Sequence, residues 1–130
     1  MNFDKSSALL PRFHQLIPGG AHTYAKGDDQ YPAGMAPVIA RGQGCRVWDV
    51  DNNEFIEYGS GLRAVSLGHA YPSVIAAVRH QVSLGTNFVR PTAIELECAE
   101  TLLDLLPNAD MVKFCKDGSD AVSGALKLAR

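Results

Sequence analysis

Apolar residues recur at helical spacing in three stretches of the second half of the chain. In the first stretch Ile75, Val78 and Val82 fall at i, i+3 and i+7, which places them on one helical face. Pro72 suits the first helical turn, where its missing N–H group costs nothing, and Gly85 suits the C-terminal cap. This pattern predicts a helix between Pro72 and Gly85.

The second stretch has the strongest start signal in the chain. Thr92 and Glu95 have the spacing of a capping box, in which each residue satisfies an unpaired backbone N–H group. Pro107 ends the pattern because it cannot continue a helix. The apolar residues between these signals share one helical face: Leu96, Ala99, Leu103 and Leu106.

The last stretch follows a short apolar run. Residues 111–115 predict a strand, and Ser119 begins a predicted helix. One face of that helix is apolar, with Val122, Ala125, Leu126 and Ala129. No Gly, Asn or Pro stops the pattern before Arg130, so we expect the chain to be cut from a longer polypeptide.

The first half of the chain is less regular. Residues 1–17 predict a helical or extended lead-in, and residues 18–44 are dense in Gly and Pro, as in an irregular segment with one short strand at 38–40. Residues 45–50 and 54–58 are β-prone runs separated by Asp-Asn-Asn, which predicts a hairpin. A Gly-Ser-Gly break and a flexible stretch are expected after it, leading to Gly68 and His69.

Composition excludes several classes of function. The chain is 46% hydrophobic and 20% charged with a net charge of -2, which gives no electrostatic footprint for nucleic acid. Its apolar runs are too short to cross a membrane, and the N-terminus lacks the features of a signal peptide. Three cysteines without a C-x-x-C pair and four scattered histidines indicate neither a disulfide framework nor a metal site. We therefore expect buried, reduced thiols in a cytoplasmic protein.

The strand, turn and helix predicted over residues 111–130 form a candidate anion site. The free N–H groups and the dipole of a helix N-terminus favour a phosphate, Gly118 allows close backbone approach, and the Ser119 hydroxyl adds a donor. Lys116 contributes positive charge nearby. The alternative is purely structural, with Asp117 or Ser119 as a helix cap and Gly118 as a turn former.

Five stretches in this order resemble the front part of class III, pyridoxal-phosphate-dependent aminotransferases, and most of all the glutamate-1-semialdehyde 2,1-aminomutase group. They are residues 18–20, 44–58, 67–72, 85–88 and 114–130. The resemblance implies an α/β protein, the N-terminal portion of a fold type I transferase. It also implies two parts: residues 1–58 as an N-terminal segment with the β-hairpin of the small domain, and residues 59–130 as the start of the large cofactor-binding domain.

The same resemblance assigns the cofactor, pyridoxal 5'-phosphate, to the helix N-terminus. Gly118 and Ser119 match the Gly-Ser or Gly-Thr pair that holds the cofactor phosphate in the family, and Asp117 adjoins them. Family members usually read Asn-Ser-Gly-Ser/Thr-Glu-Ala here, whereas this chain reads Lys-Asp-Gly-Ser-Asp-Ala. A carboxylate at Asp117 is unfavourable beside a phosphate unless it points away, pairs with Lys116 or caps the helix.

In relatives the loop over residues 59–69 lies near the substrate, often with a large aromatic residue. Here Leu62 occupies that region, and Ser60 and Arg63 are candidate substrate contacts. A guanidinium binds a carboxylate in bidentate fashion. Arg63 is equally compatible with a solvent-facing loop position or a subunit contact, and His69 is interpreted as a structural hydrogen-bonding residue.

The resemblance places the Schiff-base lysine and the acid that faces the pyridine nitrogen downstream of the phosphate-binding helix. We therefore expect no catalytic residue among residues 1–130, an inactive isolated chain, and an active full-length enzyme. Its substrates would be a small-molecule amino donor and a carbonyl compound, without nucleic acid or membrane partners. Family members are dimers, which implies a homodimer.

Two other classes of function stay open. A non-catalytic module binding a phosphate or a nucleotide sugar would use the same helix N-terminus and need no downstream lysine. A structural fragment without a retained site is the third alternative. Within the enzyme hypothesis, the altered Lys116-Asp117 pair and the missing aromatic residue favour a relative acting on another amino donor and a carbonyl substrate over a strict glutamate-1-semialdehyde enzyme.

Overall fold

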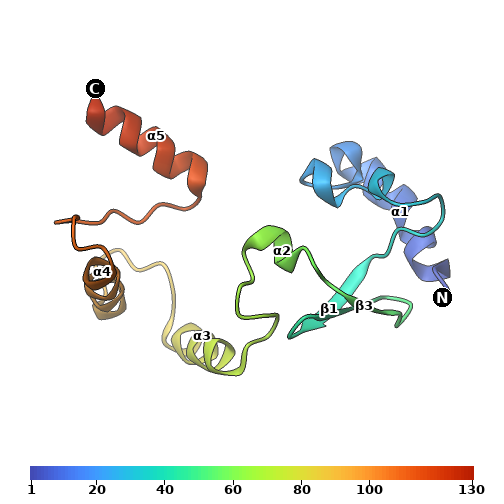
Figure 1. Ribbon diagram of the computed structural model, residues 1–130, viewed down its shortest axis with the longest axis horizontal. Coiled ribbons are helices and arrows are strands. Elements are labelled where there is room, and N and C mark those ends of the chain that lie inside the picture. Colours follow the sequence, from blue (N-terminus) through green and yellow to red (C-terminus); the bar gives the residue numbers. More distant parts are fainter. The chain divides into compact units, whose positions relative to one another are not determined.

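The structure, a computed structural model, describes residues 1–130, which form two compact units, Met1–Leu84 and Gly85–Arg130 (Figure 1). The expectation of buried thiols is wrong: Cys45, Cys98 and Cys115 are all exposed, because few side chains are buried in either unit. No helix in either unit is long and apolar enough to cross a membrane. The boundary predicted after Tyr58 concerns the domains of the whole protein and stays a prediction.

Helix α1 (Asp4–Leu16) opens the N-terminal unit, so the lead-in is helical. Three short 3-10 helices follow within the Gly- and Pro-rich segment, as expected for irregular chain: η1 (Pro18–Gly20), η2 (Tyr24–Lys26) and η3 (Asp28–Gln30). Glycine is favoured at Gly19 and Gly20, whose φ angles of 72° and 73° lie in the left-handed region.

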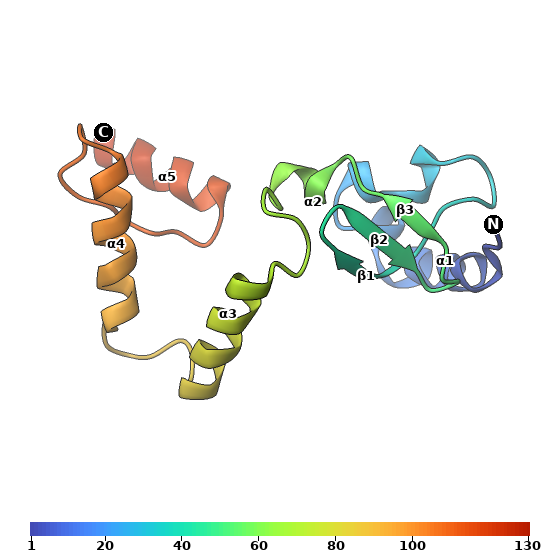
Figure 2. The ribbon, with the colours of Figure 1, turned by 60° about the horizontal axis from the view of Figure 1, so that its bottom comes forward.

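The predicted hairpin is confirmed and is part of a three-stranded antiparallel sheet of order β1-β2-β3 (Figure 2). The strands are β1 (Ile39–Gln43), β2 (Arg46–Asp49) and β3 (Glu54–Ile56). Val47 pairs with both Gly42 and Phe55, which fixes the register on its two sides. In the turn between β2 and β3, Asn52 has a φ of 65°, as the Asp-Asn-Asn sequence led us to expect.

Helix α1 is attached to the sheet by polar contacts. The Asp51 carboxylate accepts hydrogen bonds from the backbone N–H groups of Lys5 and Ser6, at 2.9 and 2.8 Å, and from the Ser6 hydroxyl at 2.8 Å. The same hydroxyl accepts the N–H of Val38 at 3.2 Å. Ser6 and Asp49 are the most deeply buried residues of the unit, so its centre is as much polar as apolar.

Helix α3 (Pro72–Leu84) follows the prediction, and Gly85 after it has a φ of 103°, typical of a left-handed helix-ending residue. In the C-terminal unit α4 (Ala93–Leu105) begins with the predicted capping box: the Glu95 carboxylate accepts the Thr92 N–H at 2.6 Å. The apolar faces of α3 and α4 are partly exposed, at Val78, Val82 and Leu96 among others.

The prediction of a strand over residues 111–115 is wrong. That segment forms no β-ladder, whereas the helix after it, α5 (Gly118–Ala129), is present. A strand needs a neighbour to pair its N–H and C=O groups, and the C-terminal unit contains no other strand. A helix makes its hydrogen bonds internally, so α5 forms without such a partner.

Candidate functional site

The N-terminus of α5 offers unpaired hydrogen-bond donors. The Asp117 carboxylate caps the helix by accepting the N–H of Asp120 at 3.0 Å, and the Asp117 carbonyl accepts the N–H of Ala121 at 3.1 Å. The backbone N–H groups of Gly118 and Ser119 and the Ser119 hydroxyl have no partner in the chain. Two oriented N–H groups at the positive end of a 12-residue helix are suited to bind an anion.

The space beside Gly118 is open. A Cβ atom built at this position would meet no atom within 4 Å, and its φ angle is not in the left-handed region. The backbone conformation therefore does not require glycine here. What glycine provides is room for a group outside the chain to approach the backbone closely.

Asp117 has the structural role that the sequence left open as an alternative. Its side chain caps α5, and no salt bridge joins it to Lys116. Capping and anion binding are compatible, because the cap uses the N–H of Asp120 and leaves those of Gly118 and Ser119 free. The negative charge of Asp117 nevertheless lies one residue before these donors, which weakens their attraction for a phosphate.

The loop after β3, expected to be flexible, contains a defined turn. Helix α2 (Ser60–Arg63) is one turn in which every residue has a positive φ: 44° at Ser60, 58° at Gly61, 59° at Leu62 and 71° at Arg63. The Arg63 N–H donates to the Gly59 carbonyl at 2.8 Å. The turn is thus left-handed, a conformation that L-residues adopt at a cost and that only glycine visits freely.

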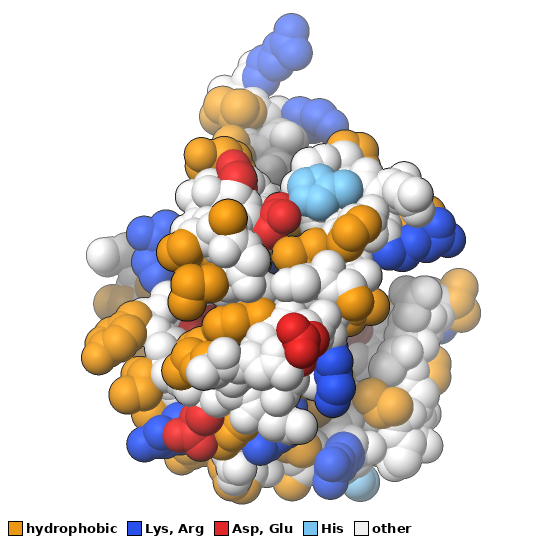
Figure 3. Space-filling model, turned by 90° about the vertical axis from the view of Figure 1, so that its right-hand side faces the viewer, with side chains coloured by type: hydrophobic (Ala, Val, Ile, Leu, Met, Phe, Trp, Pro, Cys, Tyr) orange, Lys and Arg blue, Asp and Glu red, His pale blue; other side chains and the backbone are white.

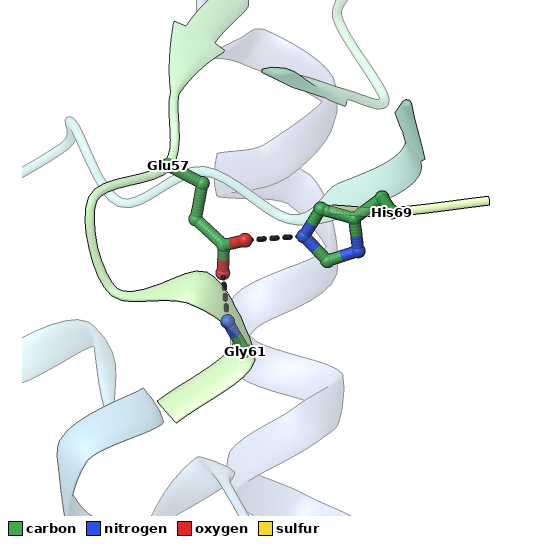
Figure 4. Close-up of polar contacts among 3 residues, drawn as sticks. All are labelled: Glu57, Gly61 and His69. Atoms are coloured by element: carbon green, nitrogen blue, oxygen red, sulfur yellow. Dashed lines mark hydrogen bonds and ion pairs between the residues drawn. The ribbon is translucent and has the colours of Figure 1, made fainter. Parts of the chain in front are cut away.

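Glu57 links this turn to the Gly68–His69 segment, as Figure 4 shows. One carboxylate oxygen accepts the N–H of Gly61 at 3.1 Å, and the other contacts Nε2 of His69. The hydrogen bond from His69 is the main cause that lowers the pKa of Glu57, followed by the opposing effect of desolvation and by the hydrogen bond from Gly61. Glu57 is therefore a charged group at neutral pH.

His69 has the structural hydrogen-bonding role predicted for it, but Glu57 was not singled out from the sequence. The two residues are twelve positions apart across an irregular loop, and no periodicity connects them. A small pocket of about 250 Å³ lies against the pair. Its lining includes Cys45, Ser60 and Ser66 in addition to Glu57 and His69.

The structure places the two predicted substrate contacts differently. Ser60 lines the pocket, whereas Arg63 is exposed and has no ion-pair partner in the chain. Ser60 and Arg63 lie in the N-terminal unit, and Asp117, Gly118 and Ser119 lie in the C-terminal unit.

On the face in Figure 3, positively and negatively charged side chains are scattered among exposed apolar ones, without a large patch of one charge.

Curated relatives match nearly the whole chain. The chain is 35% identical over 127 residues to glutamate-1-semialdehyde 2,1-aminomutase of Desulfitobacterium hafniense (strain DSM 10664 / DCB-2), a match that covers 97% of this chain and 29% of the relative. The chain thus spans less than a third of the length of this relative.

Solved transaminase structures also match nearly the whole chain. An omega-transaminase from Sphaerobacter thermophilus superposes with a TM-score of 0.84 at 33% identity, over 95% of this chain and 27% of its own. A transaminase with PLP bound superposes with a TM-score of 0.89 at 34% identity, over 100% of this chain and 30% of its own. The architecture is therefore the predicted part of an α/β, fold type I domain. The sequence profile described as aminotransferase class-III matches residues 25–130, and the chain belongs to the class III aminotransferase family.

Proposed function

We propose that the full-length protein is a pyridoxal-phosphate-dependent enzyme that moves amino groups, as an aminotransferase or an aminomutase. Membership of the class III family supports this proposal. Within this chain, the main supporting observation is the set of unpaired donors at the N-terminus of α5. The two unpaired N–H groups and the Ser119 hydroxyl form a donor set that fits a phosphate dianion. Open space at Gly118 lets that phosphate approach.

The chain's own residues hold and orient the cofactor in this proposal. Gly118 and Ser119 donate hydrogen bonds to the phosphate, and Asp117 keeps the first turn of α5 in shape by capping it. Donors already oriented by a helix bind an anion without reorganisation. Bound in this way, pyridoxal phosphate supplies the electron sink that amino-group chemistry needs.

We further propose that Ser60 and Arg63 contact the substrate. The exposed guanidinium of Arg63 has no partner in the chain and is free to bind a carboxylate in bidentate fashion. Ser60 lines the neighbouring pocket. The substrates would be a small-molecule amino donor and a carbonyl compound. The enzyme would act in the cytoplasm as a homodimer, without membrane or nucleic-acid partners.

The test is cofactor binding by the full-length protein. Pyridoxal 5'-phosphate is titrated into the apoprotein and followed by its absorbance, for the wild type and for Gly118→Val. The valine side chain would fill the open space beside the backbone donors, so we expect the dissociation constant to rise at least tenfold. Gly124→Val, in the same helix and also without neighbours within 4 Å, is the matched control for helix propensity.

Equal cofactor affinity in Gly118→Val and Gly124→Val would contradict the assignment of the phosphate site to the N-terminus of this helix. Phosphate binding without any amino transfer between amino acids and keto acids would favour the non-catalytic binding module instead.

A further inference from the structure

The left-handed turn α2 needs support from its surroundings. Three of its four residues, Ser60, Leu62 and Arg63, are not glycine and have φ angles between 44° and 71°. Each such residue is less stable in this conformation than in right-handed geometry, because its Cβ atom crowds the following carbonyl oxygen. A strained turn of this kind persists only where neighbouring contacts determine it, and such turns gather at functional sites.

Glu57 supplies one of these contacts. Its carboxylate accepts the N–H of Gly61, the second residue of the turn, and thereby restrains the backbone inside the left-handed segment. Gly61 is suited to this position because a Cβ atom there would lie 2.5 Å from Cγ2 of Val65. The Glu57 carboxylate contacts the His69 ring, and the positive charge of Lys26 is a smaller cause of the lowered pKa of Glu57.

His69 in turn fixes Glu57 to the sheet. Its backbone forms an antiparallel bridge with Gly44, with both N–H···O distances at 2.8 Å. Its ring lies against Gly42 of β1, where an added Cβ atom would approach Cγ of His69 to 2.6 Å. A Cβ atom at Gly68 would similarly lie 3.0 Å from Cα of Gly44. Glycines at these positions thus let the His69 segment dock directly on the sheet.

We propose that Glu57 and His69 are positioning residues that hold the α2 turn in the conformation that presents Ser60 and Arg63 to the substrate. The backbone of His69 is bonded to Gly44 beside the sheet. The His69 ring contacts Glu57, and Glu57 accepts the N–H of Gly61 in the turn (Figure 4). This inference rests on the proposed function, in which Ser60 and Arg63 contact a carboxylate-bearing substrate. The inference adds that the placement of Ser60 and Arg63 is determined by the Glu57 carboxylate and the His69 imidazole, which do not touch the substrate.

The experiment uses the full-length holoenzyme and two readouts. Hydrogen exchange of the amides of residues 61–65 reports the turn, and calorimetric titration with glutarate, a non-reacting dicarboxylate, reports carboxylate binding. We expect Glu57→Ala to speed amide exchange in the turn and to weaken glutarate binding at least tenfold. The absorbance of the bound cofactor and its dissociation constant should stay at their wild-type values, which a general loss of structure would not allow.

Two further variants sharpen the comparison. Glu57→Gln retains an oxygen that can accept the Gly61 N–H and should recover most of the glutarate affinity. Glu54→Ala is the matched control, since Glu54 is a carboxylate of β3 that pairs with Arg46 and has no contact with the turn. It should leave both readouts unchanged.

Unchanged exchange and unchanged glutarate affinity in Glu57→Ala would overturn the positioning role. Equal losses in Glu57→Ala and Glu54→Ala would do the same, because they would reduce the effect to the stability of the hairpin. A wild-type enzyme that binds pyridoxal phosphate but not glutarate would instead contradict the presentation of Arg63 to a carboxylate, whatever the exchange data show. Failure of the wild type to bind pyridoxal phosphate would contradict the proposed function.

Discussion

The carboxylate of Asp51 accepts hydrogen bonds from both the backbone N–H and the hydroxyl of Ser6, each at 2.8 Å. The two residues are 45 positions apart, and their contact attaches the first turn of α1 to the turn between β2 and β3. Ser6 also accepts the N–H of Val38, so one fully buried hydroxyl connects three segments of the N-terminal unit.

Ser6→Ala is expected to loosen α1. The substitution leaves the Val38 N–H without its acceptor and removes one donor from Asp51, which should cost about 1–3 kcal/mol. The change is measured as faster hydrogen exchange across α1 in the full-length protein. Ser7→Ala, one position further along the helix with an exposed side chain, is the control and should show wild-type exchange. Equal exchange in both variants would contradict a role for the buried hydroxyl.

The same contact predicts a pH dependence. Partial desolvation opposes the lowering of the Asp51 pKa, but hydrogen bonds from Lys5 and Ser6 outweigh it, so the pKa lies below its ordinary value. A carboxyl group with a lowered pKa in the folded state adds stability above its unfolded pKa of about 4, and this stability is lost as the pH falls through the folded value. Glu57 acts in the same direction.

We therefore expect the denaturant midpoint to fall below about pH 5, and to fall less steeply in Asp51→Asn, which lacks the titrating group. The wild type and this variant should differ most near neutral pH and converge in acid. Asp104→Asn, at an exposed residue of α4, is the comparison and should follow the wild-type curve. A constant difference between wild type and Asp51→Asn at all pH values would refute the linkage.

The capping box of α4 gives a third prediction. Thr92→Ala removes the N-cap side chain and should reduce the stability of the helix by about 1 kcal/mol. Thr101→Ala is a matched change inside the same helix, where the Thr101 hydroxyl donates to the Glu97 carbonyl. Alanine is the better helix former at an internal position, so this variant should be neutral or slightly stabilising. Hydrogen exchange of the first turn of α4 distinguishes the two outcomes.

Two substitutions at the α5 N-terminus should change cofactor affinity in opposite directions. Ser119→Ala removes one hydrogen bond to a charged group, about 1.5–3 kcal/mol, so the dissociation constant of pyridoxal phosphate should rise roughly tenfold to 150-fold. Asp117→Asn keeps a capping oxygen and removes the negative charge, so affinity should increase a few-fold. Absorbance titration of the apoprotein measures both. Weaker binding in Asp117→Asn would indicate that the carboxylate charge supports the site.

Local signals in the sequence were sufficient to predict most of the elements. The hairpin, the start of α4 at Thr92, the end of α3 at Gly85 and the cap-and-donor arrangement at Asp117–Ser119 all depend on residues within a few positions of one another. Caps, tight turns and amphipathic periods act over that range, so the residue types alone specify them.

The tertiary structure decided the features that depend on residues far apart. The link from Glu57 to His69 and the docking of Ser6 on Asp51 have no periodic signature, because each requires two segments to meet in space. The left-handed conformation of residues 60–63 is local, but three of these four residues are not glycine, so their types do not indicate it. The strand expected at residues 111–115 is absent because its hydrogen bonds need a neighbouring strand, whereas the hydrogen bonds of α5 lie within the helix itself. The sequence by itself determined the candidate phosphate donors, whereas the contacts of Glu57 with Gly61 and His69 became visible only in the three-dimensional arrangement, because an irregular loop separates these residues along the chain.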